Sequence, residues 1–312
     1  MDNKEFDIII LGGGPAGLSA GIYAARSATK VAIIDISMLG GQPSNYLELE
    51  NYPAFSKIGG YDLMEKMEEH ADMFGIEKYP MEEIQSVDLS SEIKTVTTLN
   101  GEFRAKSIII ATGAQPKKLG VNGEKEFLGR GVSYCAVCDG AFYKDKLVAV
   151  VGGGNAAVEE AMYLTKFANK VYVIHRRDEL RADKIVQERA FKNEKMEFIF
   201  DSVVKEIKGK DLVTTVVIEN VKTGEIKDLE INGIFPYIGF TPNVDLFNGQ
   251  VEQDKNGFIK TDETMQTNIK GVYAIGDVRT TPLRQVITAA ADGAVAAVYA
   301  GRYIETLKEV TV

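Results

Sequence analysis

The chain has 312 residues, of which 45% are hydrophobic and 26% charged, and its formal net charge is −9. This length suits about two domains of an ordinary globular protein, and the negative charge excludes a general nucleic-acid binder, which would carry a basic face. No apolar run approaches the ~20 residues that span a bilayer, and the first residues lack the basic-then-apolar pattern of a signal peptide. We therefore expect a cytoplasmic protein that binds neither nucleic acid nor membrane.

The chain opens with an apolar run and a glycine-rich turn. Residues 6–11 contain three consecutive isoleucines, as in a strand buried on both faces. Gly12, Gly14 and Gly17 follow and open a helix to about residue 27, and the next strand ends in Asp35. Glycines let the backbone approach a pyrophosphate, the helix start offers free N–H groups, and the acid suits a ribose hydroxyl. The pattern predicts a dinucleotide site, and the alternative is a packing turn.

Residues 40–113 combine loops, one helix and a run of short strands. Gly40-Gly41-Gln42 and Asn51 lie in expected loops, and a helix to about residue 73 is expected to follow Gly59-Gly60-Tyr61. Three strands are expected between residues 84 and 110, with a hairpin turn at residues 100–101 and Gly113 after the last strand. We interpret His70, in the helix, as a solvated side chain rather than a ligand.

The chain holds two cysteines, Cys135 and Cys138, directly followed by Asp139. In a reducing cytoplasm, such a pair is more often catalytic or metal-binding than structural. Structural zinc usually needs four Cys or His ligands, and the only histidines are His70 and His175. A redox-active dithiol is therefore predicted, with a half zinc site or a structural disulfide as the alternatives.

A second strand–glycine–helix–strand unit follows the cysteines. A strand is expected at residues 146–151, then a turn containing Gly152, Gly154 and Ala157, a helix to about residue 168, and a strand at residues 170–174. Where the first unit has an acid, this one has basic side chains that would accommodate a 2′-phosphate through bidentate hydrogen bonds. They are His175, Arg176, Arg177 and Arg181. The site should prefer NADP(H). A solvated basic face is the alternative, and His175 could pack or donate equally well.

Two composition breaks, near residues 113–120 and 239–245, indicate that one domain is inserted into another. The first domain would comprise residues 1–116 plus 246–312, and the insert residues 117–245. Short strands are expected at residues 196–235 to complete the insert. The first domain would resume with a short strand ending in Gly276-Asp277 and an Ala-rich helix from Val286 to about residue 303.

These motifs together resemble the low-molecular-weight (bacterial-type) thioredoxin reductases over the whole chain. The most specific of them is the dithiol placed just ahead of the second glycine turn. The resemblance implies an α/β fold of two Rossmann-like (three-layer ββα) nucleotide-binding domains, the second inserted in the first. It also implies FAD in the first domain, NADPH in the second, a homodimer, and thioredoxin as the protein substrate.

By matching motifs, the resemblance assigns residues to each cofactor. FAD would contact Gly12, Gly14, Pro15, Ala16, Gly17, Asp35, Gly40, Gly41, Gln42, Asn51, Gly113, Gly276, Asp277, Arg284, Gln285 and Val286. NADPH would contact Gly152, Gly154, Asn155, Ala156, Ala157, His175, Arg176, Arg177 and Arg181.

The resemblance also assigns the chemistry of the dithiol. Cys138 would face the flavin and Cys135 would attack the disulfide of thioredoxin, with Asp139 as the adjacent acid–base candidate. Because dithiol and NADPH turn share one domain, we expect the insert to rotate between half-reactions. Two alternatives stay open: a flavin-dependent reductase of another small redox protein, such as a peroxiredoxin system component, and a non-catalytic nucleotide-binding flavoprotein.

Overall fold

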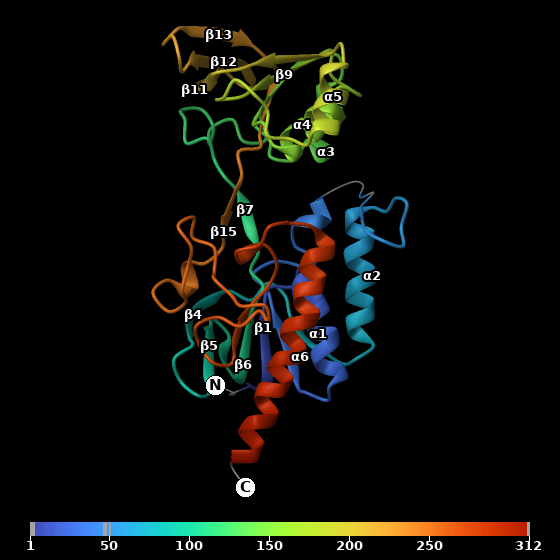
Figure 1. Cartoon of the computed structure of the whole chain (residues 1–312), viewed down its shortest axis with the longest axis vertical. Helices are drawn as coiled ribbons and strands as arrows, with labels where there is room; N and C mark the ends of the chain where they lie inside the picture. Colours follow the sequence, from blue (N-terminus) through green and yellow to red (C-terminus); the bar gives the residue numbers. More distant parts are fainter. Residues whose placement is uncertain (1–3, 46–48, 50, 311–312) are drawn as a thin grey trace. The chain divides into compact units, whose positions relative to one another are not determined.

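The computed structural model describes residues 4–45, 49 and 51–310, with the side chains of residues 137, 138 and 308–310 left out (Figure 1). Its contacts divide the chain into a first unit, Met1–Gln115 with Thr241–Val312, and a second unit, Pro116–Phe240. The expected insert, residues 117–245, thus differs at both boundaries: Pro116 falls in the second unit, and residues 241–245 fall in the first unit. The reason for the second difference is local packing, because buried Val244 and Phe247 belong to the hydrophobic core of the first unit.

The first unit is built on a seven-stranded sheet in the order β3-β2-β1-β6-β5-β4, with β16 also paired to β6. Parallel pairing joins β1 to β2 and β6, β2 to β3, and β6 to β16, so the carboxyl ends of these strands share one edge. The strands β4, β5 and β6 form an antiparallel meander. The bounds are β1 (Lys4–Leu11), β2 (Val31–Ile34), β3 (Glu77–Tyr79), β4 (Ile84–Asp88), β5 (Lys94–Thr98), β6 (Gly101–Ile110) and β16 (Val272–Ala274).

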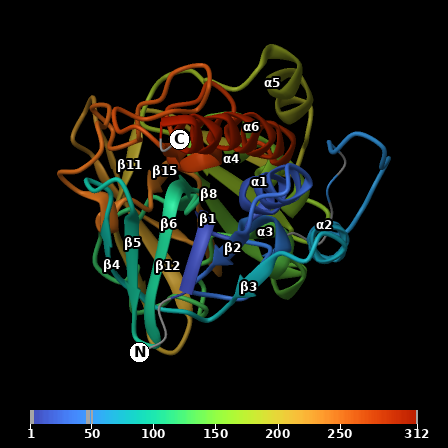
Figure 2. The same ribbon diagram turned by 90° about the horizontal axis from the view of Figure 1, so that it is seen from below.

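Both faces of this sheet are buried, which explains the continuous apolar run of β1. Ile8 and Ile10 pack into the core shared with the helices α1 (Pro15–Arg26) and α6 (Val286–Val310). Ile9 and Leu11 point to the opposite core, as expected for side chains that alternate along a strand. Figure 2 shows α1, α6 and α2 (Gly60–Asp72) along one side of the row formed by β3, β2, β1 and β6.

The second unit repeats this layered plan. Its parallel sheet has the order β10-β9-β8-β14, and an antiparallel sheet of β11, β12 and β13 covers one face. Helices α3, α4 and α5 pack on the other face. The bounds are α3 (Ala136–Asp139), β8 (Leu147–Val151), α4 (Asn155–Leu164), β9 (Lys170–Ile174), α5 (Lys184–Phe191), β10 (Met196–Ile199), β11 (Ser202–Gly209), β12 (Val213–Asn220), β13 (Ile226–Glu230) and β14 (Gly233–Pro236). Two nucleotide-binding-type units, the second inserted in the first, are the fold that was predicted.

Short elements complete the chain, and two helix ends and one whole helix differ from expectation. The strands β7 (Ala114–Pro116) and β15 (Phe240–Pro242) pair where the chain passes between the units. The short 3-10 turns are η1 (Gln42–Asn45), η2 (Gly140–Tyr143), η3 (Asp245–Phe247) and η4 (Gly276–Val278). Helix α4 ends at Leu164, where the hydroxyl of Thr165 donates to the carbonyl of Met162 at 2.6 Å. Helix α5 was not expected, and α6 continues to Val310. None of the helices in the described ranges is long and apolar enough to cross a membrane.

Candidate functional site

The first glycine turn distinguishes glycines that the chain itself requires from one that leaves room beside it. Gly12 has φ +113°, and a Cβ there would lie 2.3 Å from the carbonyl oxygen of Ala111. A Cβ at Gly17 would lie 1.9 Å from the carbonyl oxygen of Gly12. At Gly14, at the start of α1, the nearest atom to such a Cβ is 3.9 Å away, which is an ordinary contact, so the chain itself does not require a glycine there. A phosphate could approach the backbone there.

The predicted flavin residues meet at the carboxyl edge of the first sheet. The amide of Gly13 donates to Asp35 Oδ2 at 2.7 Å, and the amide of Gly40 donates to the carbonyl of Gly13 at 2.9 Å. The other carboxylate oxygen of Asp35 accepts from the amide and hydroxyl of a serine two residues on. A separate hydrogen bond joins two residues that lie 234 positions apart in the chain: Asn51 Nδ2 donates to Gln285 Oε1 at 2.8 Å.

A charged pair lies at the same edge, beside η4 and the start of α6. Burial raises the pKa of the Asp277 carboxyl, and the positive charge of Arg284 opposes that rise. The Arg284 guanidinium lies 4.0 Å from the ring centroid of Phe258, a cation–π distance. Among the described residues, its buried Nε has no hydrogen-bond partner. An unpaired buried donor beside a carboxyl is consistent with a polar ligand such as FAD, and the predicted FAD contacts stay predictions.

The second glycine turn packs against the ring of His175. Gly152 has φ +150°, and a Cβ at Gly153 would lie 2.5 Å from Cε1 of the His175 ring. Burial, and then the charges of three arginines, lower the pKa of His175, so the imidazole is neutral at neutral pH. At Gly154 a Cβ would meet nothing within 4 Å. The two turns are therefore alike in that the chain itself does not require the third glycine of either, and Gly154 borders open space.

The three arginines after β9 are exposed. Within the described part of the chain, none of the guanidinium groups of Arg176, Arg177 and Arg181 has a hydrogen bond or an ion pair. The amide of Arg181 donates to the carbonyl of Gly153 at 2.6 Å, which fixes this arginine beside the glycine turn. Three unpaired cations next to an open nucleotide turn fit the 2′-phosphate of NADPH.

The cysteine segment, residues 133–139, lies in the same unit. Cys135 is half-buried and disulfide-bonded; Cys138 is the other cysteine of the sequence, and its side chain lies outside the description. The amide of Ala136 donates to the hydroxyl of Tyr237 at 2.9 Å. Asp139 is half-buried, and its charge adds to the burial that raises the pKa of Tyr143 to about 12.

Comparison with known proteins decides the family. Residues 6–293 match the family model described as pyridine nucleotide-disulphide oxidoreductase. The chain is 49% identical over 312 residues to a thioredoxin reductase of Peptoclostridium acidaminophilum, covering 98% of each chain. The chain belongs to the thioredoxin reductases of this family. The resemblance seen in the motifs is therefore confirmed.

Solved structures agree with this membership. The thioredoxin reductase of Lactococcus lactis, in the FR conformation, is 46% identical, with a TM-score of 0.91 over 96% of this chain and 99% of that one. That of Streptococcus pyogenes is 49% identical, with a TM-score of 0.68 over 98% of this chain and 100% of that one. The predicted fold is confirmed. As a member of this family, the chain is an NADPH-dependent oxidoreductase that uses FAD.

Several residues of this thioredoxin reductase family member had no signal in the sequence. Tyr237 contacts the cysteine segment from about a hundred positions away, and the carboxylate of Glu124 accepts the hydroxyl of Tyr134 at 2.6 Å. Asp292 of α6 binds Arg279 through both oxygens, at 2.7 and 2.9 Å, and also accepts the amide of Gly276. Only the fold brings these partners together.

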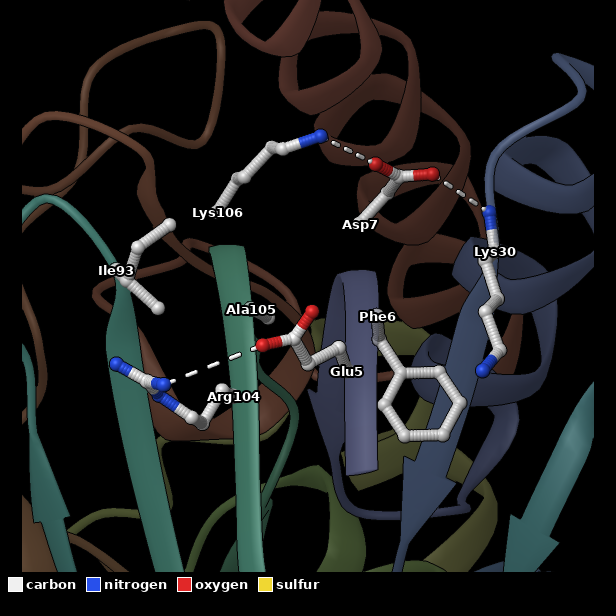
Figure 3. Close-up of a pocket in the computed structure, with 8 residues that line it drawn as sticks. All are labelled: Glu5, Phe6, Asp7, Lys30, Ile93, Arg104, Ala105 and Lys106. Atoms are coloured by element: carbon white, nitrogen blue, oxygen red, sulfur yellow. Dashed lines mark hydrogen bonds and ion pairs between the residues drawn. The ribbon is translucent and has the colours of Figure 1, made fainter. Parts of the chain in front are cut away.

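A cavity of about 260 Å³ lies beside the starts of β1 and β6, at the opposite edge of the first sheet (Figure 3). Lys106 Nζ lies 2.9 Å from Asp7 Oδ1, and Arg104 Nη1 lies 3.9 Å from Glu5 Oε1. None of the predicted site residues lines this cavity, and these charges compensate one another. We therefore assign it no part in the site.

Proposed function

We propose that this chain reduces the disulfide of thioredoxin, using electrons that pass from NADPH through FAD to a disulfide between Cys135 and Cys138. The observation that carries the proposal is that three features lie in the same unit. They are the disulfide-bonded Cys135, the glycine turn with open space beside Gly154, and the three exposed arginines. The names of the relatives support thioredoxin as the acceptor.

The two cofactors, when bound, supply hydride transfer and a relay of electrons to the disulfide. The residues of the chain would bind and orient them. The Gly14 turn and Asp277 would hold FAD, and the Gly154 turn with the arginines would hold NADPH. In the dithiol step, Asp139 would move the proton that thiol–disulfide exchange requires, because the thiolate is the attacking form.

We further propose that the second unit rotates between the two half-reactions. The dithiol and the NADPH turn share this unit, so each must in turn serve a flavin held by the other unit.

For the setting, we propose a cytoplasmic homodimer that does not bind nucleic acid. In a reducing compartment a cysteine pair is more often one that alternates between dithiol and disulfide than a permanent structural disulfide. The net charge of −9 disfavours binding to a polyanion such as nucleic acid. Light scattering should give about twice the chain mass of 34.2 kDa. A mass equal to a single chain would remove the dimer from this proposal.

The function is tested by turnover with different oxidised acceptors. Oxidised thioredoxin should be reduced with NADPH far faster than a peroxiredoxin-type partner or a small disulfide. Cys135→Ser and Cys138→Ser should each abolish this activity while leaving FAD bound. Activity that survives either substitution, or a preference for another acceptor protein, would contradict the proposal.

A further inference from the structure

We propose that Tyr237 is a positioning residue that holds the start of the cysteine segment and thereby stabilises the disulfide of Cys135 relative to the dithiol. The inference deepens the proposed function and rests on it for its biological meaning. It requires no contact between the two units, because every residue involved belongs to the second unit.

The central contact is a hydrogen bond at the first residue of α3. The amide of Ala136 donates to the hydroxyl of Tyr237 at 2.9 Å. The first amides of a helix have no partner within the helix, and Ala136 is fully buried. Without the hydroxyl, this amide would lose its partner where water is excluded, which is costlier than losing a hydrogen bond at the surface.

Tyr237 is itself held firmly by its main chain. Its amide donates to the carbonyl of Val151 at 2.7 Å. Its carbonyl oxygen is the atom that a Cβ at Gly152 would approach to 2.3 Å. The hydroxyl therefore reaches the cysteine segment from a base fixed by the end of β8 and by the glycine turn.

A second anchor holds the segment on the other side of Cys135. Tyr134, next to Cys135, donates its hydroxyl to Glu124 Oε1 at 2.6 Å. The buried carboxylate of Glu124 also accepts the amides of Leu119 and Gly120, at 2.6 and 2.7 Å. Cys135 thus lies in the chain between Tyr134 and Ala136, each of which is hydrogen-bonded to a residue outside the segment.

These anchors act on the redox equilibrium. Reduction adds two electrons and two protons, breaks the sulfur–sulfur bond and leaves two thiols free to separate. The disulfide re-forms more readily when the backbone keeps the thiols close, because their effective concentration is higher. Loosening the segment favours the dithiol, so removing an anchor should make the disulfide easier to reduce.

The test measures the ratio of disulfide to dithiol in the holoenzyme, equilibrated anaerobically with a dithiothreitol redox buffer and read by alkylation and mass spectrometry. Tyr237→Phe should lower this ratio about three- to tenfold, which is about 15 to 30 mV for a two-electron couple. Tyr134→Phe should act in the same direction. Tyr172→Phe, a half-buried tyrosine of β9, should leave the ratio unchanged.

An unchanged ratio in Tyr237→Phe would overturn the inference, as would an equal shift in Tyr172→Phe. Hydrogen exchange of wild-type protein adds a measurement that needs no variant. The Ala136 amide should exchange faster after reduction, because a bond that favours the disulfide must be weaker in the dithiol form, and equal protection in both forms would also overturn the inference. Both measurements use dithiothreitol and no thioredoxin, so their outcome does not depend on the proposed function. The proposed function fails by a different result, namely that thioredoxin is not reduced.

Discussion

Gly14 and Gly17 belong to one motif, but glycine serves a different purpose at each of these two positions. Gly17 is required by the chain, since a Cβ there would lie 1.9 Å from a backbone oxygen. Gly14 has φ −75°, which any residue adopts, and a Cβ there would meet nothing closer than 3.9 Å. The chain itself therefore does not require a glycine at position 14, and its absent side chain suits the close approach of a ligand.

Gly14→Ala should keep the fold and lose flavin. The added methyl fits the protein but obstructs the approach of a pyrophosphate, so FAD affinity should fall by about tenfold or more, measured by titrating apoprotein. Thermal unfolding of the apoprotein should be unchanged. Gly17→Ala is the matched comparison and should destabilise the apoprotein by about 1–3 kcal/mol or more. Unaltered FAD binding in Gly14→Ala would place the pyrophosphate elsewhere.

Arg177→Ala should weaken NADPH binding by about 10- to 100-fold, because a charge-assisted hydrogen bond contributes about 1.5–3 kcal/mol. NADH binding should hardly change, since it lacks the 2′-phosphate. Isothermal titration with both nucleotides separates the two effects. Arg189→Ala, an exposed arginine of α5, is the control and should alter neither affinity. Unchanged affinity for NADPH would support a solvated basic face instead, and equal losses for NADPH and NADH would place Arg177 away from the 2′-phosphate.

Asp139→Asn should slow disulfide reduction by about 100-fold or more, the usual contribution of a general acid–base group. FAD content and the bleaching of flavin absorbance by NADPH should be preserved. The matched control is Asp145→Asn, which makes the same change at an exposed position of the same unit. If Asp139→Asn turns over like the wild type, Asp139 has no part in the mechanism.

At the scale of elements, α4 carries an unusual carboxyl. Glu160 Oε2 is buried and has no hydrogen-bond partner among the described residues. Burial, and secondarily the charge of Glu159, raise the pKa of Glu160 to about 7. The folded protein therefore binds this proton more tightly than the unfolded chain does.

A raised pKa in the folded state gives a definite dependence of stability on pH. The contribution of Glu160 is fully present below the unfolded pKa of about 4.5 and is lost as pH rises towards about 7. Thermal unfolding should show Glu160→Gln losing less stability than the wild type between pH 5 and pH 8, by about 3 kcal/mol at most. Parallel pH profiles for the two proteins would contradict the raised pKa.

Most elements could be predicted because their signals are local. The strands β1, β8 and β9 and the two glycine turns follow from spacing within about 35 residues, and the structure places them as expected. Helix α5 was missed because only Val186 and Ala190 of it are buried, which leaves almost no apolar stripe. Tyr237 was missed because its partner Ala136 lies about a hundred positions away, and Glu124 because its contacts form in a loop with no periodic pattern.

At the scale of the molecule, the central expectation is rotation of the second unit. A short bifunctional lysine cross-linker that joins the two units should reduce steady-state turnover about tenfold or more and spare one half-reaction, because each half-reaction needs its own arrangement. A monofunctional reagent of the same chemistry is the control. If protein shown by mass spectrometry to be cross-linked between the units keeps full turnover, rotation is not required.

The most direct measurement of the whole account is an anaerobic titration with NADPH, followed by flavin absorbance and by counting thiols. We expect a yellow protein whose flavin absorbance bleaches, with two new thiols per chain, and whose thiols and colour return to the oxidised state on addition of oxidised thioredoxin. A colourless protein that cannot take up FAD, or bleaching in which no thiols appear, would contradict it.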